Sequence, residues 1–218
     1  MKTKWLSLAL CLLPLYAQAE TASYGVRLTH WSWKESKLYG DEVKSSGMAF
    51  GPTLLFRIDP SERWSIGLDG LYGMLDDMDR ADVNATLGYA VSSMFTVFAD
   101  LRYQWFDSEL EATGEVDGTA VGPGLGAAFN APLGESGFHL FSSVRVSPMF
   151  LDYPGDEAPD NAVQWCYEGG LGYAIPVGEM ERGNLYLSLG YRYQQMRASD
   201  LDERVGAPFF EMGFRQMF

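Results

Sequence analysis

The feature that most constrains this chain is a two-residue alternation of apolar and polar side chains that recurs along most of its length. It is clearest near the end of the sequence, where Phe210, Met212 and Phe214 are large and apolar. The residues between them are Glu211 and Gly213. Side chains of a β-strand point alternately to opposite faces, so this spacing predicts a strand with one apolar face and one polar face. We find no convincing amphipathic helix pattern in the chain beyond its N-terminal leader.

The leader is predicted to be a cleaved secretory signal peptide covering residues 1–19. Lys2 and Lys4 precede an apolar stretch at 5–16, and Ala-Gln-Ala at 17–19 is a small-x-small cleavage site. Cleavage would leave a single domain over 20–218. Because the leader holds two lysines and no acidic residue, its removal lowers the formal charge from −13 to −15. Such a charge argues against a nucleic-acid partner.

The remaining sequence favours strands over helices. The full chain is rich in glycine (24 residues) and in Phe, Tyr and Trp (13, 12 and 6), and all but Trp5 and Tyr16 of these lie after the leader. No apolar run approaches the roughly 18 residues that a transmembrane helix needs. Alternating segments recur between polar or Gly/Pro-rich connections, and they predict ten strands, at about 23–34, 47–59, 64–75, 80–92, 95–107, 119–132, 138–151, 163–177, 184–197 and 205–218.

The connections between these strands alternate in character. Those at 60–63, 93–94, 133–137 and 178–183 are compact, whereas those between, such as 108–118 and 152–162, are mostly longer and acidic. Short periplasmic turns and longer extracellular loops are the asymmetry of an outer-membrane barrel. We therefore predict an all-β, closed antiparallel transmembrane β-barrel of ten strands, with eight as the alternative count. An open sheet is disfavoured because each unpaired backbone group in hydrocarbon costs several kcal/mol.

Charged residues and most strand glycines fall on one face, and the other face carries no charge. We predict that this polar face lines the lumen, since glycine suits a narrow lumen better than an exposed strand surface. A soluble barrel would place its apolar face inward instead. The predicted lumen charges are Arg27, Arg57, Asp69, Asp82, Asp100, Arg102, Arg145, Glu168, Arg192, Glu211 and Arg215.

Aromatic residues edge the apolar face at both ends, as expected of girdles at the two membrane interfaces. The predicted girdle residues are Trp64 and Phe95 near the short turns, and Tyr72, Trp105, Trp165 and Tyr193 near the long loops.

Together these features resemble the small bacterial outer-membrane β-barrels, the group that includes OmpA-like and opacity-protein-like barrels. The resemblance is architectural and covers the whole chain after the leader. It implies a C-terminal strand recognised by the barrel assembly machinery, matched here by Phe210, Met212, Phe214 and the terminal Phe218, while Gln216 departs from the hydrophobic residue usual at that place. The implied location is the outer membrane of a Gram-negative bacterium, among lipid and lipopolysaccharide, and we expect a monomer.

The predicted lumen charges nearly cancel, six positive against five negative. We therefore expect paired ions that fill the interior of a structural or surface-interaction protein. A narrow pore for small solutes is the alternative. The acidic loops are expected to form a solvated rim, although they could hold divalent cations shared with lipopolysaccharide or bind a basic partner. Asp76, Asp77 and Asp79 lack the glycine and distal glutamate of a calcium loop, so we expect no metal or cofactor site.

Enzymatic activity is not expected, and a lipid-modifying hydrolase is the second alternative. Omptin-like proteases use a histidine at the outer rim, but His139 follows a short turn and belongs at the opposite end. His30 and Ser32 have the His-x-Ser spacing of lipid A deacylases, although in those enzymes the motif lies in a late strand. His30 is more simply an interfacial residue beside Trp31. Cys166, the one cysteine after the leader, is expected to be inert packing on the inward face.

Overall fold

The structure is a computed structural model of the 218-residue chain. It describes residues 21–33, 36–38, 41–43, 45–58, 61, 63–76, 78–110, 114–152, 161–177, 183–198 and 202–217. The predicted signal peptide and Phe218 lie outside these described residues.

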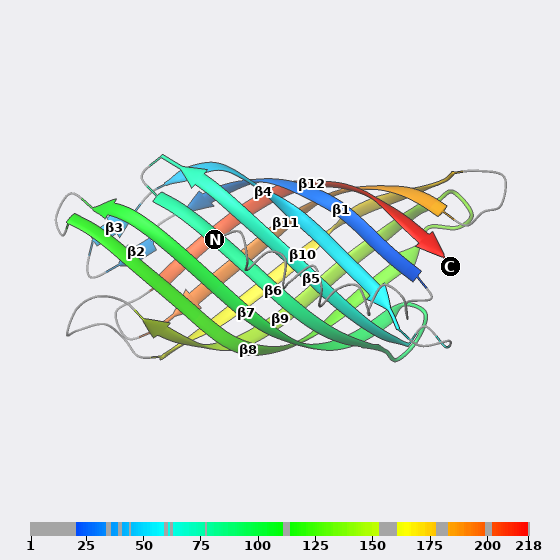
Figure 1. The fold of residues 1–218 in the computed structure, drawn as a ribbon, viewed down its shortest axis with the longest axis horizontal. Helices are drawn as coiled ribbons and strands as arrows, with labels where there is room; N and C mark the ends of the chain where they lie inside the picture. The colour runs from blue at the N-terminus through cyan, green and yellow to red at the C-terminus, as the bar shows by residue number, and fades with distance from the viewer. Residues whose placement is uncertain are drawn as a thin grey trace, which may run out of the picture.

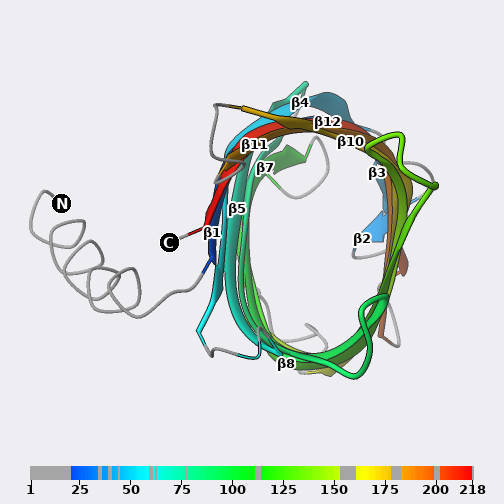
Figure 2. The same ribbon diagram turned by 90° about the vertical axis from the view of Figure 1, so that its right-hand side faces the viewer.

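Ten long antiparallel strands close into a barrel, which confirms the predicted fold and strand count (Figures 1 and 2). The last of them pairs with the first from Thr21↔Met217 to Trp33↔Val205, so the sheet has no free edge along the barrel. The barrel strands are β1 (Thr21–Trp33), β4 (Ser46–Arg57), β5 (Trp64–Leu75), β6 (Met78–Ala90), β7 (Phe95–Leu110), β8 (Gly114–Pro132), β9 (Phe138–Asp152), β10 (Asn161–Pro176), β11 (Gly183–Arg197) and β12 (Asp202–Met217).

The structure differs from the expected strand plan in two of the long connections. Two short strands, β2 (Ser36–Leu38) and β3 (Asp41–Val43), pair with each other between β1 and β4, and β2 meets β12 at Lys37↔Asp202. The predicted acidic loop at 108–118 is mostly strand, because β7 and β8 keep pairing as far as Leu110↔Gly114. Continued pairing satisfies backbone groups that a loop would leave to solvent.

The outward surface of the barrel is apolar along every long strand. Exposed large hydrophobic residues occur at alternate positions, for example Leu101, Leu125 and Leu189, and Leu125 is 67% exposed. A continuous apolar band of this kind is the lipid-facing surface of a membrane barrel. Phe56 differs from the rest of its face, since it is buried with Ala22 and contacts Leu54 and Ile58. Within the described ranges no helix is long and apolar enough to cross a bilayer.

The inward face carries the polar residues and a core confined to one end. This core lies toward the long-loop end, the left-hand end of Figure 1, where β2 and β3 also lie. We call it the lumen plug; its buried members are Trp31, Ala49, Leu71, Leu75, Met78, Phe106, Ala120, Met149, Ala162, Met196, Val205 and Ala207.

Glycines on the inward face of β8 let neighbouring groups come close. A Cβ at Gly122 would collide with the backbone carbonyl of Pro148 on β9. A Cβ at Gly124 would collide with the side chains of Asp100 and Ser147. The first glycine therefore allows the approach of two backbones, and the second leaves space that side chains from β7 and β9 fill.

Candidate functional site in the barrel lumen

The candidate site is the charged interior of the barrel, which the structure divides into three linked groups of side chains. All are carried by inward positions of the strands, because residues two apart on a strand share a face. The first group lies where the barrel closes. Arg27 on β1 donates from Nε to Glu211 Oε2 on β12 at 2.8 Å, and from Nη1 to Glu168 Oε2 on β10 at 3.0 Å.

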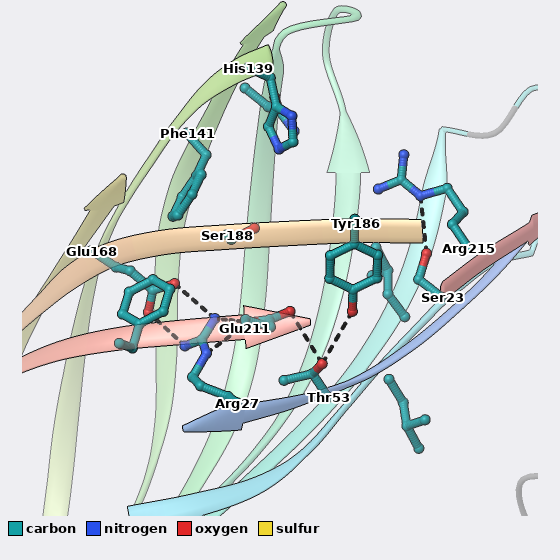
Figure 3. Close-up of a pocket in the computed structure, with 14 residues that line it drawn as sticks. Ser23, Arg27, Thr53, His139, Phe141, Glu168, Tyr186, Ser188, Glu211 and Arg215 are labelled. Carbon is teal, nitrogen blue, oxygen red and sulfur yellow. Dashed lines mark hydrogen bonds and ion pairs between the residues drawn. The ribbon is translucent and has the colours of Figure 1, made fainter. Parts of the chain in front are cut away.

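This first group forms a neutral network of two arginines and two glutamates, of which Figure 3 shows Arg27, Glu168 and Glu211. Arg192 on β11 donates from Nε to Glu168 Oε2 at 2.8 Å, so one carboxylate is shared by two guanidinium groups. Glu211 also accepts the Thr53 hydroxyl at 3.2 Å, and the Tyr186 hydroxyl lies 3.4 Å from Thr53 Oγ1. The Arg27 guanidinium covers the Phe209 ring at 4.3 Å. Charge-assisted bonds of this kind fix the geometry of both partners.

The second group is carried by β5, β6, β7, β9 and β10. Arg145 donates to Asp100 and, at 3.3 Å, to the side-chain carbonyl of Asn84. Asn84 in turn donates to Asp69 at 2.8 Å. Arg102, which has no exposed surface, donates to the side-chain carbonyl of Gln164 across the lumen.

The third group lies beside the lumen plug. Its member Arg80 is the first residue of the predicted strand at 80–92, and its member Glu203 falls in a segment that the sequence pattern predicts to be a connection. Arg80 donates from Nε to Asp82 Oδ1 at 2.7 Å and from Nη1 to Glu203 Oε1 at 2.6 Å. The Arg80 guanidinium also lies over the Trp31 ring at 5.4 Å. The two-residue alternation indicates that both residues face the lumen. Arg80 is two residues from Asp82 and Glu203 is two residues from Val205, so each shares the inward face of its strand.

Neutral amides join the second and third groups. Gln104 donates to Asp82 at 3.1 Å and accepts from Gln164 at 2.8 Å. Gln104 and Gln164 are both buried. Neither amide was predicted as a site residue, because charge alone marked the lumen positions in the sequence. Arg80 and Glu203 add one charge of each sign, so the lumen set keeps its near balance.

A cavity of about 210 Å³ occupies the short-turn half of the lumen, opposite the lumen plug (Figure 3). The Arg27, Glu168 and Glu211 network forms part of its lining, together with Tyr186 and Phe141. His139 and Arg215 also line it, and Arg215 donates from Nε to Ser23 Oγ at 3.1 Å. Within the described part of the chain, no group of three or more His, Cys, Asp or Glu side chains could hold a metal ion.

The remaining candidate residues are spread over both faces. Arg57 is the last residue of β4 and lies opposite Thr21 of β1 and Ser65 of β5. The girdle residues Trp64, Phe95, Tyr72, Trp165 and Tyr193 are exposed on the outward face, and Trp105 is partly buried there. Phe210, Met212 and Phe214 point outward from β12, with Met212 more exposed than Phe214.

The histidines and the cysteine have separate surroundings. His139 lines the cavity at the short-turn end, away from the long-loop rim. His30 and Ser32 face outward from β1, and neither is hydrogen-bonded to a carboxylate among the described residues. The deacylase alternative stays a prediction. Cys166 is buried on the inward face of β10.

Comparison with known proteins gives no family for the chain. No protein-family model matches it, and no curated protein sequence matches it. The solved structures that resemble it include outer-membrane β-barrels. The outer membrane protease OmpT from Escherichia coli has 8% identity and a TM-score of 0.48, covering 91% of this chain and 96% of that one. An outer membrane channel from Pseudomonas putida F1 has 11% identity and a TM-score of 0.46, covering 90% and 95%.

Neisserial surface protein A also resembles the chain, with 13% identity and a TM-score of 0.40, covering 90% of this chain and 97% of that one. The names of these three structures describe a protease, a channel and a surface protein, so the likeness points to no single role. Only the geometry of this chain's own residues bears on its function.

Proposed function

We propose that this chain is an outer-membrane β-barrel of a Gram-negative bacterium with a structural or surface-interaction role, and that its lumen does not conduct. The observation that carries the proposal is the lumen plug. Trp31, Met149 and Met196 are each at most 2% exposed although they project into the lumen. An open channel would leave such side chains in contact with water.

The Arg80, Asp82 and Glu203 bridge supports the same proposal. It ties β6 to β12 next to the lumen plug, and both Arg80 and Asp82 are buried. A charge that lined a conducting path would be hydrated, whereas a buried charge must be paired to offset its desolvation. The three charged groups therefore act as packing that holds the interior of the barrel together.

The outward surface supports the membrane location and the partners. The apolar band suits lipid, and the girdle residues at its two ends suit the lipid interfaces. We assign the short turns to the periplasm and the long-loop end to the cell surface, where lipopolysaccharide would surround the rim. The C-terminal strand, with Phe210, Met212, Phe214 and Phe218, would be the segment recognised by the barrel assembly machinery. Nothing in this role requires a second copy or a cofactor.

Conductance of the folded protein in planar lipid bilayers tests the proposal. We expect no discrete current steps from the unmodified protein. A variant with Trp31→Ala, Met149→Gly and Met196→Gly should conduct, because it removes three large, fully buried side chains of the lumen plug. The matched control, Leu55→Gly with Phe141→Gly, enlarges the cavity at the other end and should stay closed. Regular steps from the unmodified protein would establish the narrow-pore alternative instead.

Gel migration tests the barrel itself, independently of conductance. A folded membrane barrel resists dodecyl sulfate until it is boiled, so heated and unheated samples should migrate differently. Equal migration of the two samples would contradict the membrane barrel as well as the proposed role.

A further inference from the structure

The middle of the lumen contains buried nitrogen atoms that have no hydrogen-bond acceptor. Five such atoms are found among the described residues: Nε and Nη2 of Arg102, Nε of Arg145, Nη1 of Arg192 and Nε2 of Gln194. Arg102 has no exposed surface and Gln194 is 3% exposed. A buried donor without an acceptor is unfavourable, and a cationic one more so. This part of the lumen therefore has an excess of donors.

The strand register gathers these donors around one residue, Cys166. Arg145 on β9 and Gln194 on β11 are its direct partners on the two neighbouring strands. Gln164 is the next inward residue of β10 toward the long-loop end, and its side-chain carbonyl accepts a hydrogen bond from Arg102. Glu168 is the next inward residue of β10 toward the short-turn end, and its carboxylate accepts a hydrogen bond from Arg192. The four donor side chains thus belong to β7, β9 and β11, and each is a direct strand partner of Cys166 or is bound by one of its two inward neighbours on β10.

Electrostatics agrees with this convergence. Cys166 interacts electrostatically with Arg102, Arg145 and Arg192, which also interact with the carboxylates of Asp82, Asp100 and Glu168. Arg102 Nη2 lies 3.9 Å from Asp82 Oδ2, which is an ion pair but too long for a hydrogen bond. The side chain of Cys166 is small and is a weak acceptor, so it cannot satisfy four donor groups. Two other unpaired atoms, Asp100 Oδ1 and Ser147 Oγ, both adjoin Gly124, and a small shift would let the hydroxyl donate to the carboxylate. That pairing would remove the one unpaired acceptor and leave the nitrogen donors.

We propose that the N–H groups of Arg102, Arg145, Arg192 and Gln194 bind a monatomic anion, chloride, over the Cys166 side chain. A spherical ion accepts hydrogen bonds from any direction, which suits donors that are carried by three different strands. A tetrahedral or planar oxyanion needs more room than this closely packed layer offers. The long arginine side chains can part slightly to admit a small ion. Its route of entry is the short-turn cavity, whose lining includes Glu168, the next inward residue of β10 after Cys166.

Bromide replacement tests the site in the unmodified protein. In crystals grown in sodium bromide, an anomalous difference map at the bromine edge should show a peak among the Arg102, Arg145 and Arg192 nitrogens. A map without a peak at this place would overturn the proposal, whether water or no density is found there. This measurement does not depend on the proposed surface role, because the site would exist in a closed or a conducting barrel.

A substitution that supplies a fixed anion gives a second test. The Tm of the detergent-folded protein should rise with chloride concentration when gluconate keeps the ionic strength constant, because a ligand that binds only the folded state stabilises it. Cys166→Asp places a carboxylate among the same donors and should abolish this dependence. The control Cys166→Ser introduces an uncharged side chain of similar size. The Tm of this variant should still rise with chloride concentration. Equal Tm values in the two salts, or an unchanged chloride dependence in Cys166→Asp, would show that no anion binds here.

Discussion

Arg27 and Glu211 are direct partners across the seam that closes the barrel, and their side chains are joined by hydrogen bonds of 2.8 and 2.6 Å. The first and last strands are thus tied by an ion pair as well as by their backbone ladder. Both side chains are mostly buried, with 12% and 13% of their surface exposed. The pair also connects to Glu168 on β10, so the seam is tied to a strand that β11 separates from β12.

We predict that Glu211→Gln destabilises the closed barrel. The change leaves Arg27 with a weaker partner at the seam, and breaking a buried pair costs about 3 to 5 kcal/mol. The variant keeps the side-chain oxygen as an acceptor and keeps Glu168 as a partner of Arg27, so the loss should fall below this range, at about 2 to 3 kcal/mol. Denaturant titration of the detergent-folded protein measures the free energy of unfolding.

The matched control for this seam pair is Asp202→Asn at the rim. Asp202 pairs with Arg204 at 2.7 Å but both side chains are about one-third exposed. An exposed pair contributes about 1 kcal/mol or less, so this variant should stay close to the parent. Equal losses of unfolding free energy in the two variants would show that the buried seam pair stabilises the barrel no more than an exposed pair does.

A glycine on β8 gives a second prediction. Gly122→Ala should destabilise the barrel by about 1 to 3 kcal/mol, because the new methyl group meets the Pro148 carbonyl and the two backbones must separate. Gly67→Ala on β5 is the control, since its added Cβ would lie 3.5 Å from the nearest atom. That variant should be neutral or slightly stabilising, because alanine reduces the freedom of the unfolded chain. The same unfolding titration ranks the two, and a reversed order would contradict the close approach of β8 and β9.

A pair of leucines tests which face of the barrel meets lipid. Leu125→Arg places a charge on the exposed apolar band and should cost about 2 to 4 kcal/mol if the site lies near the bilayer midplane. Leu55→Arg makes the same change at a residue that lines the lumen cavity, beside polar groups. Refolding into lipid vesicles should suffer more from the first change than from the second. A larger loss from Leu55→Arg would place the apolar face inward, as in a soluble barrel.

Deletion of Phe218 tests the predicted assembly signal. We expect lower levels of folded protein in the outer membrane, because the assembly machinery would lose its terminal aromatic contact. The unfolding free energy of the purified truncated barrel should change little, since β12 keeps its pairing with β1 and β11. Quantitative blotting of outer-membrane fractions measures the first effect. Normal levels of the truncated protein would show that the terminal residue is not needed for recognition.

Much of the fold was predictable because a strand alternates with a period of two. This period assigned Phe210 and Met212 to one face and Glu211 and Arg215 to the other before any contact was known. It also gave the ten long strands, since turn residues interrupt the pattern. It was less reliable at strand ends. Arg80 is the first residue of a predicted strand and Glu203 falls in a predicted connection, whereas the structure starts β6 at Met78 and β12 at Asp202. Pairing of β6 with β7 and of β12 with β11 extends the sheet past both residues.

The sequence by itself determined the face of each side chain, because that follows from local backbone geometry. Only the tertiary structure decided which charges meet. Arg27 and Glu168 are 141 residues apart and lie on strands that are not neighbours in the sheet. Their contact depends on strand tilt and on closure of the barrel, which place distant inward positions at one level. The same closure collects Trp31, Met149 and Met196 at one end and leaves a cavity at the other, an asymmetry that the alternation along each strand does not contain.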